Sequence, residues 1–210
     1  PTPDFALLAA KSAPIDLASK FGLNKPFLFY PAQFWAHKNH IGILKALRQL
    51  KDEQGSEIDV AFVGADFGNR DFVQKRAKEL GLESQVHILG FVERDEMIAL
   101  YREAFALAYT STFGPENLPP LEAMALGCPV IAGAVDGAQE QFGDAALLVD
   151  PYQPSDLADA IAKLMDDEKL KNTLIERGRQ RAAKWTSQDF VRGVFEFLDQ
   201  FESIRDLWGQ

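Results

Sequence analysis

The segment Thr110–Gly133, "TSTFGPENLPPLEAMALGCPVIAG", joins two apolar runs through a turn and a short helical pattern. The glycine–proline pair at 114–115 predicts a turn. Gly127 stands where the C-terminus of a helix favours a left-handed residue. The two prolines at 119–120 fit only the first turn of a helix, where backbone N–H groups have no partner within the helix. The segment therefore predicts a strand, a loop, a helix over 118–126 and a second strand.

Short apolar runs and longer amphipathic runs alternate along the rest of the chain. The strand-like runs are 27–32, 59–65, 86–91, 105–110, 129–133 and 146–151. Helical patterns cover 39–51, 70–80, 94–102 and 118–126, and three more helices follow the last strand. We therefore expect an α/β fold, with a Rossmann-like parallel sheet of about six strands and helices on both faces. Ligands of such sheets bind beyond the carboxyl ends of the strands.

The composition is ordinary for a globular protein, with 47% hydrophobic and 25% charged residues in a chain of 210. The net charge of −9 argues against binding to the phosphate backbone of DNA or RNA. The single cysteine, Cys128, excludes an internal disulfide and fits a reducing compartment. No apolar run reaches the roughly 20 residues that cross a bilayer. We expect a cytoplasmic protein without a nucleic-acid partner, at most peripheral to the inner face of the membrane.

The helix that begins at Leu118 predicts an anion-binding site. A helix N-terminus carries roughly half a positive charge. The prolines remove two N–H donors, so the amides of Asn117 and Leu118 are among the few that remain there. Glu122 lies four residues after Leu118 and shares its face of the helix. A phosphate at the amides would place a ribose near the Glu122 carboxylate, but a proline-capped core helix with Glu122 on a solvated face fits the spacing equally well.

This segment resembles the signature of family 4 glycosyltransferases, which have the two-domain GT-B fold. Their donor-binding half typically reads E-G-F-G-L-P-x-L-E-A, and its second glutamate corresponds to Glu122, which the resemblance implies holds the ribose. The first glutamate, which touches the donor sugar, corresponds to Gly114, a clear departure. Glu116, two residues later, is a hypothetical substitute, and the alternative is a surface residue without a role. The sequence instead resembles the "FGP-x-N-[IL]-PPLEA" variant of that family.

Two further segments resemble parts of the same family. In "YPAQFWAHKNHIGILKAL" (30–47), Lys38 matches a lysine that neutralises the donor diphosphate, and Gln33 replaces the usual arginine. Gln33 can donate a hydrogen bond but brings no charge. In "VHILGFV" (86–92), the resemblance implies that Phe91 packs on the nucleobase, while a place for Phe91 in the core is the alternative.

The resemblance runs from about residue 25 to residue 185 and implies the C-terminal, donor-binding half of a GT-B glycosyltransferase. We expect residues 1–24 to form an arm or linker and 186–210 a C-terminal helix. The implied reaction moves a sugar, with retention, from a nucleotide diphosphate sugar to a hydroxyl acceptor in bacterial polysaccharide or glycolipid synthesis. An N-terminal domain missing from this chain would bind the acceptor and make any membrane contact. The catalytic candidates are Lys38 and Glu122, and the donor-binding candidates are Gln33, Phe91, Gly114, Glu116, Asn117, Leu118 and Glu122.

No cofactor or catalytic metal is expected, because the chain has no D-x-D triplet. His37 and His40 lie three residues apart, but no carboxylate or thiol nearby in the sequence completes a metal site. Two other functions remain open: a GT-B-type nucleotide-sugar epimerase, and a non-catalytic nucleotide-binding or interaction module if Gln33 and Gly114 mark a decayed site. A dehydrogenase would need a glycine fingerprint after its first strand, where this chain has "YPAQFWAHKNH".

Overall fold

The computed structural model describes residues 1–7, 14–113, 118–184 and 186–208, with the backbone alone for 201–208. Six parallel strands form one sheet in the order β3-β2-β1-β4-β5-β6. The strands are β1 (Phe27–Pro31), β2 (Asp59–Val63), β3 (Val86–Gly90), β4 (Ala106–Tyr109), β5 (Val130–Gly133) and β6 (Leu147–Val149). The chain moves outward from β1 to β3 and then returns beside β1 as β4. The strand order therefore reverses between β1 and β4, which is where such sheets bind ligands.

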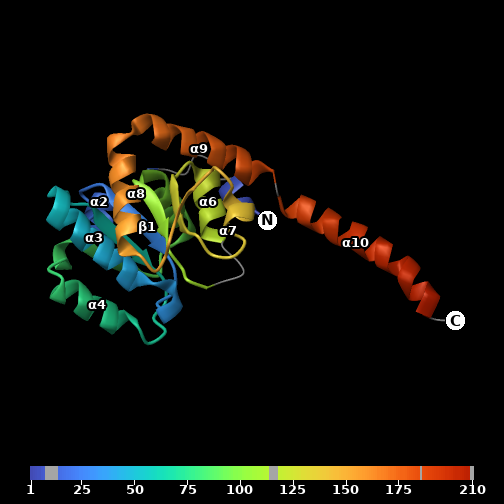
Figure 1. Ribbon diagram of the computed structural model, residues 1–210, viewed down its shortest axis with the longest axis horizontal. Coiled ribbons are helices and arrows are strands. Elements are labelled where there is room, and N and C mark those ends of the chain that lie inside the picture. The colour runs from blue at the N-terminus through green and yellow to red at the C-terminus, as the bar shows by residue number, and fades with distance from the viewer. Residues whose placement is uncertain (8–13, 114–117, 185, 209–210) are drawn as a thin grey trace.

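Helices cover both faces of the sheet (Figure 1). On one face, α3 (His40–Gln54) packs against α4 (Arg70–Glu79) and α8 (Pro154–Asp166). On the other face, α6 (Leu118–Leu126) packs against α1 (Asp4–Leu7), α5 (Arg94–Glu103) and α9 (Glu168–Ala183). The short elements are α2 (Leu17–Phe21), η1 (Ala36–Lys38), η2 (Glu83–Gln85) and α7 (Ala138–Phe142). Right-handed crossovers in this strand order place the helices after β1 and β2 opposite those after β3 and β4.

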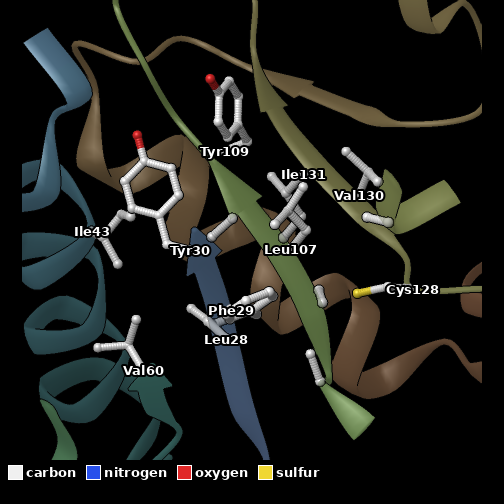
Figure 2. Close-up of a cluster of buried hydrophobic side chains, with 14 of the residues drawn as sticks. Leu28, Phe29, Tyr30, Ile43, Val60, Leu107, Tyr109, Cys128, Val130 and Ile131 are labelled. Carbon is white, nitrogen blue, oxygen red and sulfur yellow. The ribbon is translucent and has the colours of Figure 1, made fainter. Parts of the chain in front are cut away.

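The core lies between these two helical layers and the sheet. Every residue of β2, β4 and β5 is buried, as expected for strands that are covered on both faces. Figure 2 shows Leu28 of β1, Leu107 of β4 and Ile131 of β5, which all belong to one apolar cluster. Burial of such side chains contributes about 25 cal/mol per Å² of apolar surface, which makes the central strands a rigid base for the loops above them.

The predicted α/β fold and parallel sheet are confirmed. Each predicted strand is present, and its limits agree with the prediction to within two residues. The helix predicted over 39–51 continues to Gln54, because Gly55 is the first residue with a left-handed conformation that ends it, at φ 63°. The sequence pattern did not indicate the short elements α2, η1 and α7, which have too few residues for a helical period to be recognised.

The two ends of the chain differ in their packing. Thr2 donates its hydroxyl to the carbonyl of Ala182 at 2.8 Å, and Ala6 and Leu17 are buried. By contrast, α10 (Ser187–Trp208) extends away from the other helices in Figure 1. Over residues 187–200, where its side chains are described, the exposed large apolar residues are Phe190, Val191, Val194, Phe195, Phe197 and Leu198. None of the helices within the described ranges is both long and apolar enough to span a membrane. The domain boundaries at residues 24 and 185 stay predictions.

Asn39 joins three elements at the centre of the sheet's carboxyl edge. Its backbone is left-handed at φ 56°, a conformation that asparagine adopts more readily than most residues. Its Oδ1 accepts the N–H of Gly42 at 3.1 Å and so caps α3. Its Nδ2 donates to the carbonyls of Thr110 at 3.3 Å and Pro151 at 2.6 Å. The loop between β1 and α3 is therefore fixed against the residues that follow β4 and β6.

Candidate functional site

The loops that follow β1 and β4 meet where the strand order reverses. Thr112 donates its backbone N–H and its hydroxyl to the carbonyl of His37, at 2.9 and 3.1 Å. The hydroxyl of Tyr30 donates to the carbonyl of Lys38 at 2.5 Å. Figure 2 shows the hydroxyls of Tyr30 and Tyr109 beyond the carboxyl ends of β1 and β4. These contacts hold η1, and with it Lys38, in a defined position at this edge.

Lys38 brings a positive charge to the carboxyl end of β4. Its Nζ donates to the hydroxyl of Tyr109 at 3.3 Å and lies 5.6 Å from the centre of the Tyr109 ring. Burial lowers the pKa of Lys38. Among the residues that the structure describes, Lys38 has no carboxylate within ion-pair distance. A partly buried ammonium without a counter-ion is unfavourable, so this position is suited to an anionic ligand.

Glu122 of α6 is the carboxylate whose charge acts on Tyr109. Its Oε2 accepts the hydroxyl of Tyr101, on α5, at 2.6 Å. Burial raises the pKa of Glu122, and the hydrogen bond from Tyr101 acts in the opposite direction. Burial, together with the charge of Glu122, raises the pKa of Tyr109 to about 12. Tyr109 thus interacts with the ammonium of Lys38 and with the carboxylate of Glu122, and Glu122 is half-buried rather than on a solvated face.

Gln33 lies exposed just beyond the end of β1, close to an aromatic stack. Its Oε1 accepts the indole N–H of Trp35 at 2.9 Å. The Trp35 ring stacks on Phe67, with 4.4 Å between ring centres and 17° between ring planes. Because the oxygen of Gln33 is engaged by an N–H donor, its amide nitrogen points elsewhere and can donate to a ligand. Gln33 can supply a hydrogen bond to an anion, without the charge that an arginine would add.

The other predicted donor-binding residues are placed only in part. Phe91 is 89% exposed, so the alternative that it belongs to the core is wrong. The ring follows β3 and remains available for a flat apolar ligand. Leu118 is half-buried and begins α6. Gly114, Glu116 and Asn117 lie outside the described residues, so their predicted roles stay predictions.

His40 near this edge, and Cys128 at the opposite edge before the amino end of β5, both have structural surroundings. Within the described ranges, no group of three or more His, Cys, Asp or Glu side chains is arranged to hold a metal ion. The His40 ring stacks on Phe34, with 4.5 Å between ring centres and 13° between planes. Cys128 is buried, and burial raises the pKa of its thiol to about 12, which leaves it unreactive as a nucleophile.

Buried His40 should make the protein less stable in acid. Burial lowers the pKa of His40 to about 4, although the nearby Ala32 carbonyl opposes this effect, and neither ring nitrogen has a hydrogen bond of good geometry among the described residues. The unfolded chain, with a histidine pKa near 6.5, binds the proton first, so stability is lost as pH falls from 6.5 towards 4. By pH 5 the loss is about 2 kcal/mol. In urea titrations at pH 7.5 and pH 5, His40→Phe should reduce the fall in unfolding free energy by about this amount; an unchanged fall would contradict the assignment.

Sequence reasoning missed three residues of this site: Tyr101, Tyr109 and Asn39. Tyr101 lies on the apolar face of the helix predicted over 94–102, where a buried hydroxyl needs a partner. Tyr109 occupies the last position of a strand that ends at the ligand-binding edge. Asn39 precedes a helical run, the position of an N-cap. These signals could have indicated each of the three residues, but none of them predicts which residue is its hydrogen-bond partner.

Comparisons with known proteins agree with the fold. A family model described as "Glycosyl transferases group 1" matches residues 15–181. The chain is 34% identical over 173 residues to a D-inositol 3-phosphate glycosyltransferase of Corynebacterium jeikeium, covering 75% of this chain and 39% of that protein. It is 26% identical over 160 residues to O-antigen chain mannosyltransferase B of Escherichia coli, covering 76% and 42%. The solved structure of Anabaena HepE in complex with UDP-glucose matches with a TM-score of 0.76 at 26% identity, covering 88% of this chain and 51% of that one. The chain spans less than half the length of both curated relatives.

Proposed function

This chain belongs to the glycosyl transferases group 1 family, and we propose that it is the donor-binding half of a retaining glycosyltransferase. The enzyme would transfer a sugar, a hexose in our proposal, from a nucleotide diphosphate sugar to a hydroxyl acceptor. One observation carries the proposal: the ammonium of Lys38 lies beside Tyr109, and this ammonium has no ion-pair partner among the described residues. An anionic group at that edge would come within reach of Glu122, which the family signature assigns to the ribose.

In this mechanism, the chain's task is to stabilise the departing nucleoside diphosphate. Lys38 would neutralise charge that grows on the diphosphate as the bond to the sugar breaks. Of the first four residues of α6, only Leu118 and Leu121 carry a backbone N–H, since prolines occupy 119–120. Those amides would add hydrogen bonds at the positive end of the helix. Glu122 would accept the ribose hydroxyls, and Gln33 would donate to a phosphate oxygen. No step in this scheme requires a metal or a cofactor.

The acceptor would bind to a second, N-terminal domain, for which the longer relatives have sufficient additional length. This chain alone would then bind donor without turnover, because the acceptor is no longer held next to it. A relative named as an O-antigen chain mannosyltransferase supports a wider role in bacterial polysaccharide or glycolipid synthesis. We place the reaction in the cytoplasm, with any contact to the inner face of the membrane made through the second domain.

The proposal predicts that the chain binds at least one of UDP, GDP and ADP in isothermal titration calorimetry. Glu122→Gln should weaken that binding about tenfold, because a charged hydrogen-bond acceptor for the ribose is lost. The variant should also lose the preference for the ribonucleotide over its 2′-deoxy form. Glu83→Gln is the matched control, since Glu83 is an exposed glutamate on η2, which directly precedes the amino end of β3.

Two outcomes would contradict this function. If the titrations with UDP, GDP and ADP all show no heat of binding, a non-catalytic interaction module would be favoured. Binding that is unchanged in Glu122→Gln, or reduced as much in Glu83→Gln, would mean that the nucleoside does not lie against α6.

A further inference from the structure

We propose that Tyr101 is a positioning residue that holds the carboxylate of Glu122 ready to accept the hydroxyls of a ribose. The inference rests on the proposed function, since it gives Glu122 a ribose to bind. It goes beyond that function because Tyr101 lies outside the family signature and does not itself touch the ligand. It assigns a role in nucleoside binding to a side chain that is completely buried in the fold.

The geometry leaves the hydroxyl of Tyr101 one evident role. The side chain is 0% exposed, and its ring packs edge-on against Phe29 of β1, with 4.8 Å between centres and 87° between planes. The ring therefore cannot rotate freely, and its hydroxyl direction is set by the core. That hydroxyl donates to Oε2 of Glu122 at 2.6 Å, a short distance typical of a bond to a carboxylate. Among the residues that the structure describes, no second donor reaches this carboxylate, so Oε1 and the second lone pair of Oε2 are available for two donors of a ligand.

The surrounding charges show why Glu122 needs this partner. Among the described residues, Glu122 has no cation within ion-pair distance. Burial raises the pKa of Glu122, whereas the hydrogen bond from Tyr101 lowers it. Because burial and the neighbouring Glu122 hold the pKa of Tyr101 well above its usual value, Tyr101 remains a proton donor. Tyr101 thus favours the charged, acceptor form of Glu122 that a ribose requires.

Titratable and charged groups around Glu122 have to be sought on each element that packs against α6. Tyr101 on α5 contacts Glu122 directly, and Tyr109 on β4, which also contacts Lys38, is affected by its charge. The elements around α6 also carry Asp4 on α1 and Arg179 on α9, which lies against Gly127, and Cys128 follows α6. β5 brings no titratable side chain. Tyr101 is the group that donates a hydrogen bond to Glu122, so its removal should act on this carboxylate first.

Nucleotide affinity as a function of pH provides the test. The experiment measures the Kd of the chain for whichever of UDP, GDP or ADP it binds, from about pH 4 to pH 8, for the unmodified chain, Tyr101→Phe and Glu122→Gln. Tyr101→Phe should weaken binding about three- to tenfold at neutral pH, the loss of one hydrogen bond to a charged group. The pH at which affinity is lost in acid should also move upward, because Glu122 protonates more easily. Ionisation of the ligand phosphate is common to all variants and cancels in the comparison.

Tyr30→Phe is the matched control. It removes another buried tyrosine hydroxyl, but one that donates to a backbone carbonyl rather than to a carboxylate. Because this hydroxyl holds the backbone of Lys38, the variant should weaken binding, but it should leave the acid midpoint in place, since its hydroxyl does not contact Glu122. If Glu122→Gln abolishes the acid loss of affinity and Tyr101→Phe does not shift it, the inference fails and the proposed function stands. If Glu122→Gln has no effect, or no nucleotide binds to the unmodified chain, both fail together.

A spectroscopic readout covers the case in which Tyr101→Phe does not fold. A hydroxyl proton held against a carboxylate at 2.6 Å in the core should exchange slowly and give a downfield proton resonance. That resonance should be present in the unmodified chain and absent, or moved upfield, in Glu122→Gln. A chain that shows no such resonance, or one that ignores Glu122→Gln, would overturn the inference.

Discussion

Lys38→Met should weaken the binding of a nucleoside diphosphate about a hundredfold. A hydrogen bond to a charged group contributes about 1.5–3 kcal/mol, and each 1.4 kcal/mol is a factor of ten in Kd. We expect the upper end of this range because Lys38 is partly buried, and its ammonium is fixed by Tyr109 without a competing carboxylate among the described residues. Methionine keeps a flexible apolar stem against the Tyr109 ring. The change therefore removes the charge with little loss of packing.

The pattern of losses distinguishes a phosphate contact from a general disturbance. Calorimetry with a nucleoside diphosphate, the monophosphate and the free nucleoside should show the largest loss for the diphosphate and almost none for the nucleoside. Lys45→Met, which removes an exposed lysine on the nearby helix α3, should leave all three affinities unchanged. Equal losses for the nucleoside and the diphosphate would show that Lys38 supports the loop rather than the ligand.

The fold could be predicted because its strands carry a strong and local signal. In "DVAFVGA", almost every residue is apolar, and the structure buries the whole of β2. Such runs are ambiguous only at their ends, where the neighbouring residues are apolar as well. Phe91 illustrates this limit: it continues the apolar pattern of "VHILG" but lies 89% exposed after the strand has ended. A pattern of apolar residues predicts the strand, but it does not predict whether the side chain that follows the strand is buried or exposed.

Residues of the candidate site could be predicted only where a single contiguous motif identified them. Glu122 was identified within a contiguous signature, and Lys38 within another. The bond from Tyr101 to Glu122 joins residues 21 positions apart on two helices, and the contact between Lys38 and Tyr109 spans 71 positions. Those pairings depend on how α5 and α6 pack and on β4 returning beside β1. No local pattern in a single sequence indicates the packing of α5 on α6 or the position of β4 beside β1. The partners of the charged groups could therefore be identified only from the structure.

Gly64→Ala should lower the free energy of unfolding by about 3–5 kcal/mol, the largest stability effect that we expect from a single methyl group. Gly64 follows β2 with φ at 155°, a conformation that disfavours a side chain. A Cβ atom there would lie 2.4 Å from the carbonyl oxygen of Ala32 and 2.9 Å from the backbone nitrogen of Gln33. Both atoms belong to the backbone that leaves β1, and the neighbouring Phe34 N–H is held by the carbonyl of Ala65 at 3.0 Å. The loop cannot move aside without breaking these contacts.

Gly68→Ala provides the matched control, because Gly68 lies in the same loop between β2 and α4. Its φ is 87°, and a Cβ atom built on it would meet nothing within 4 Å. This variant should therefore lose only about 1 kcal/mol, the cost of a left-handed alanine. Thermal unfolding should show the difference, since each kcal/mol shifts the melting temperature by roughly 2–4 °C in a domain of this size. Equal shifts in melting temperature would mean that backbone strain at φ, and not the contact with Ala32, makes alanine unfavourable at position 64. A larger shift for Gly64→Ala would establish that the backbone after β2 packs directly against the backbone of the Gln33 loop. The sheet would then determine the position of that loop.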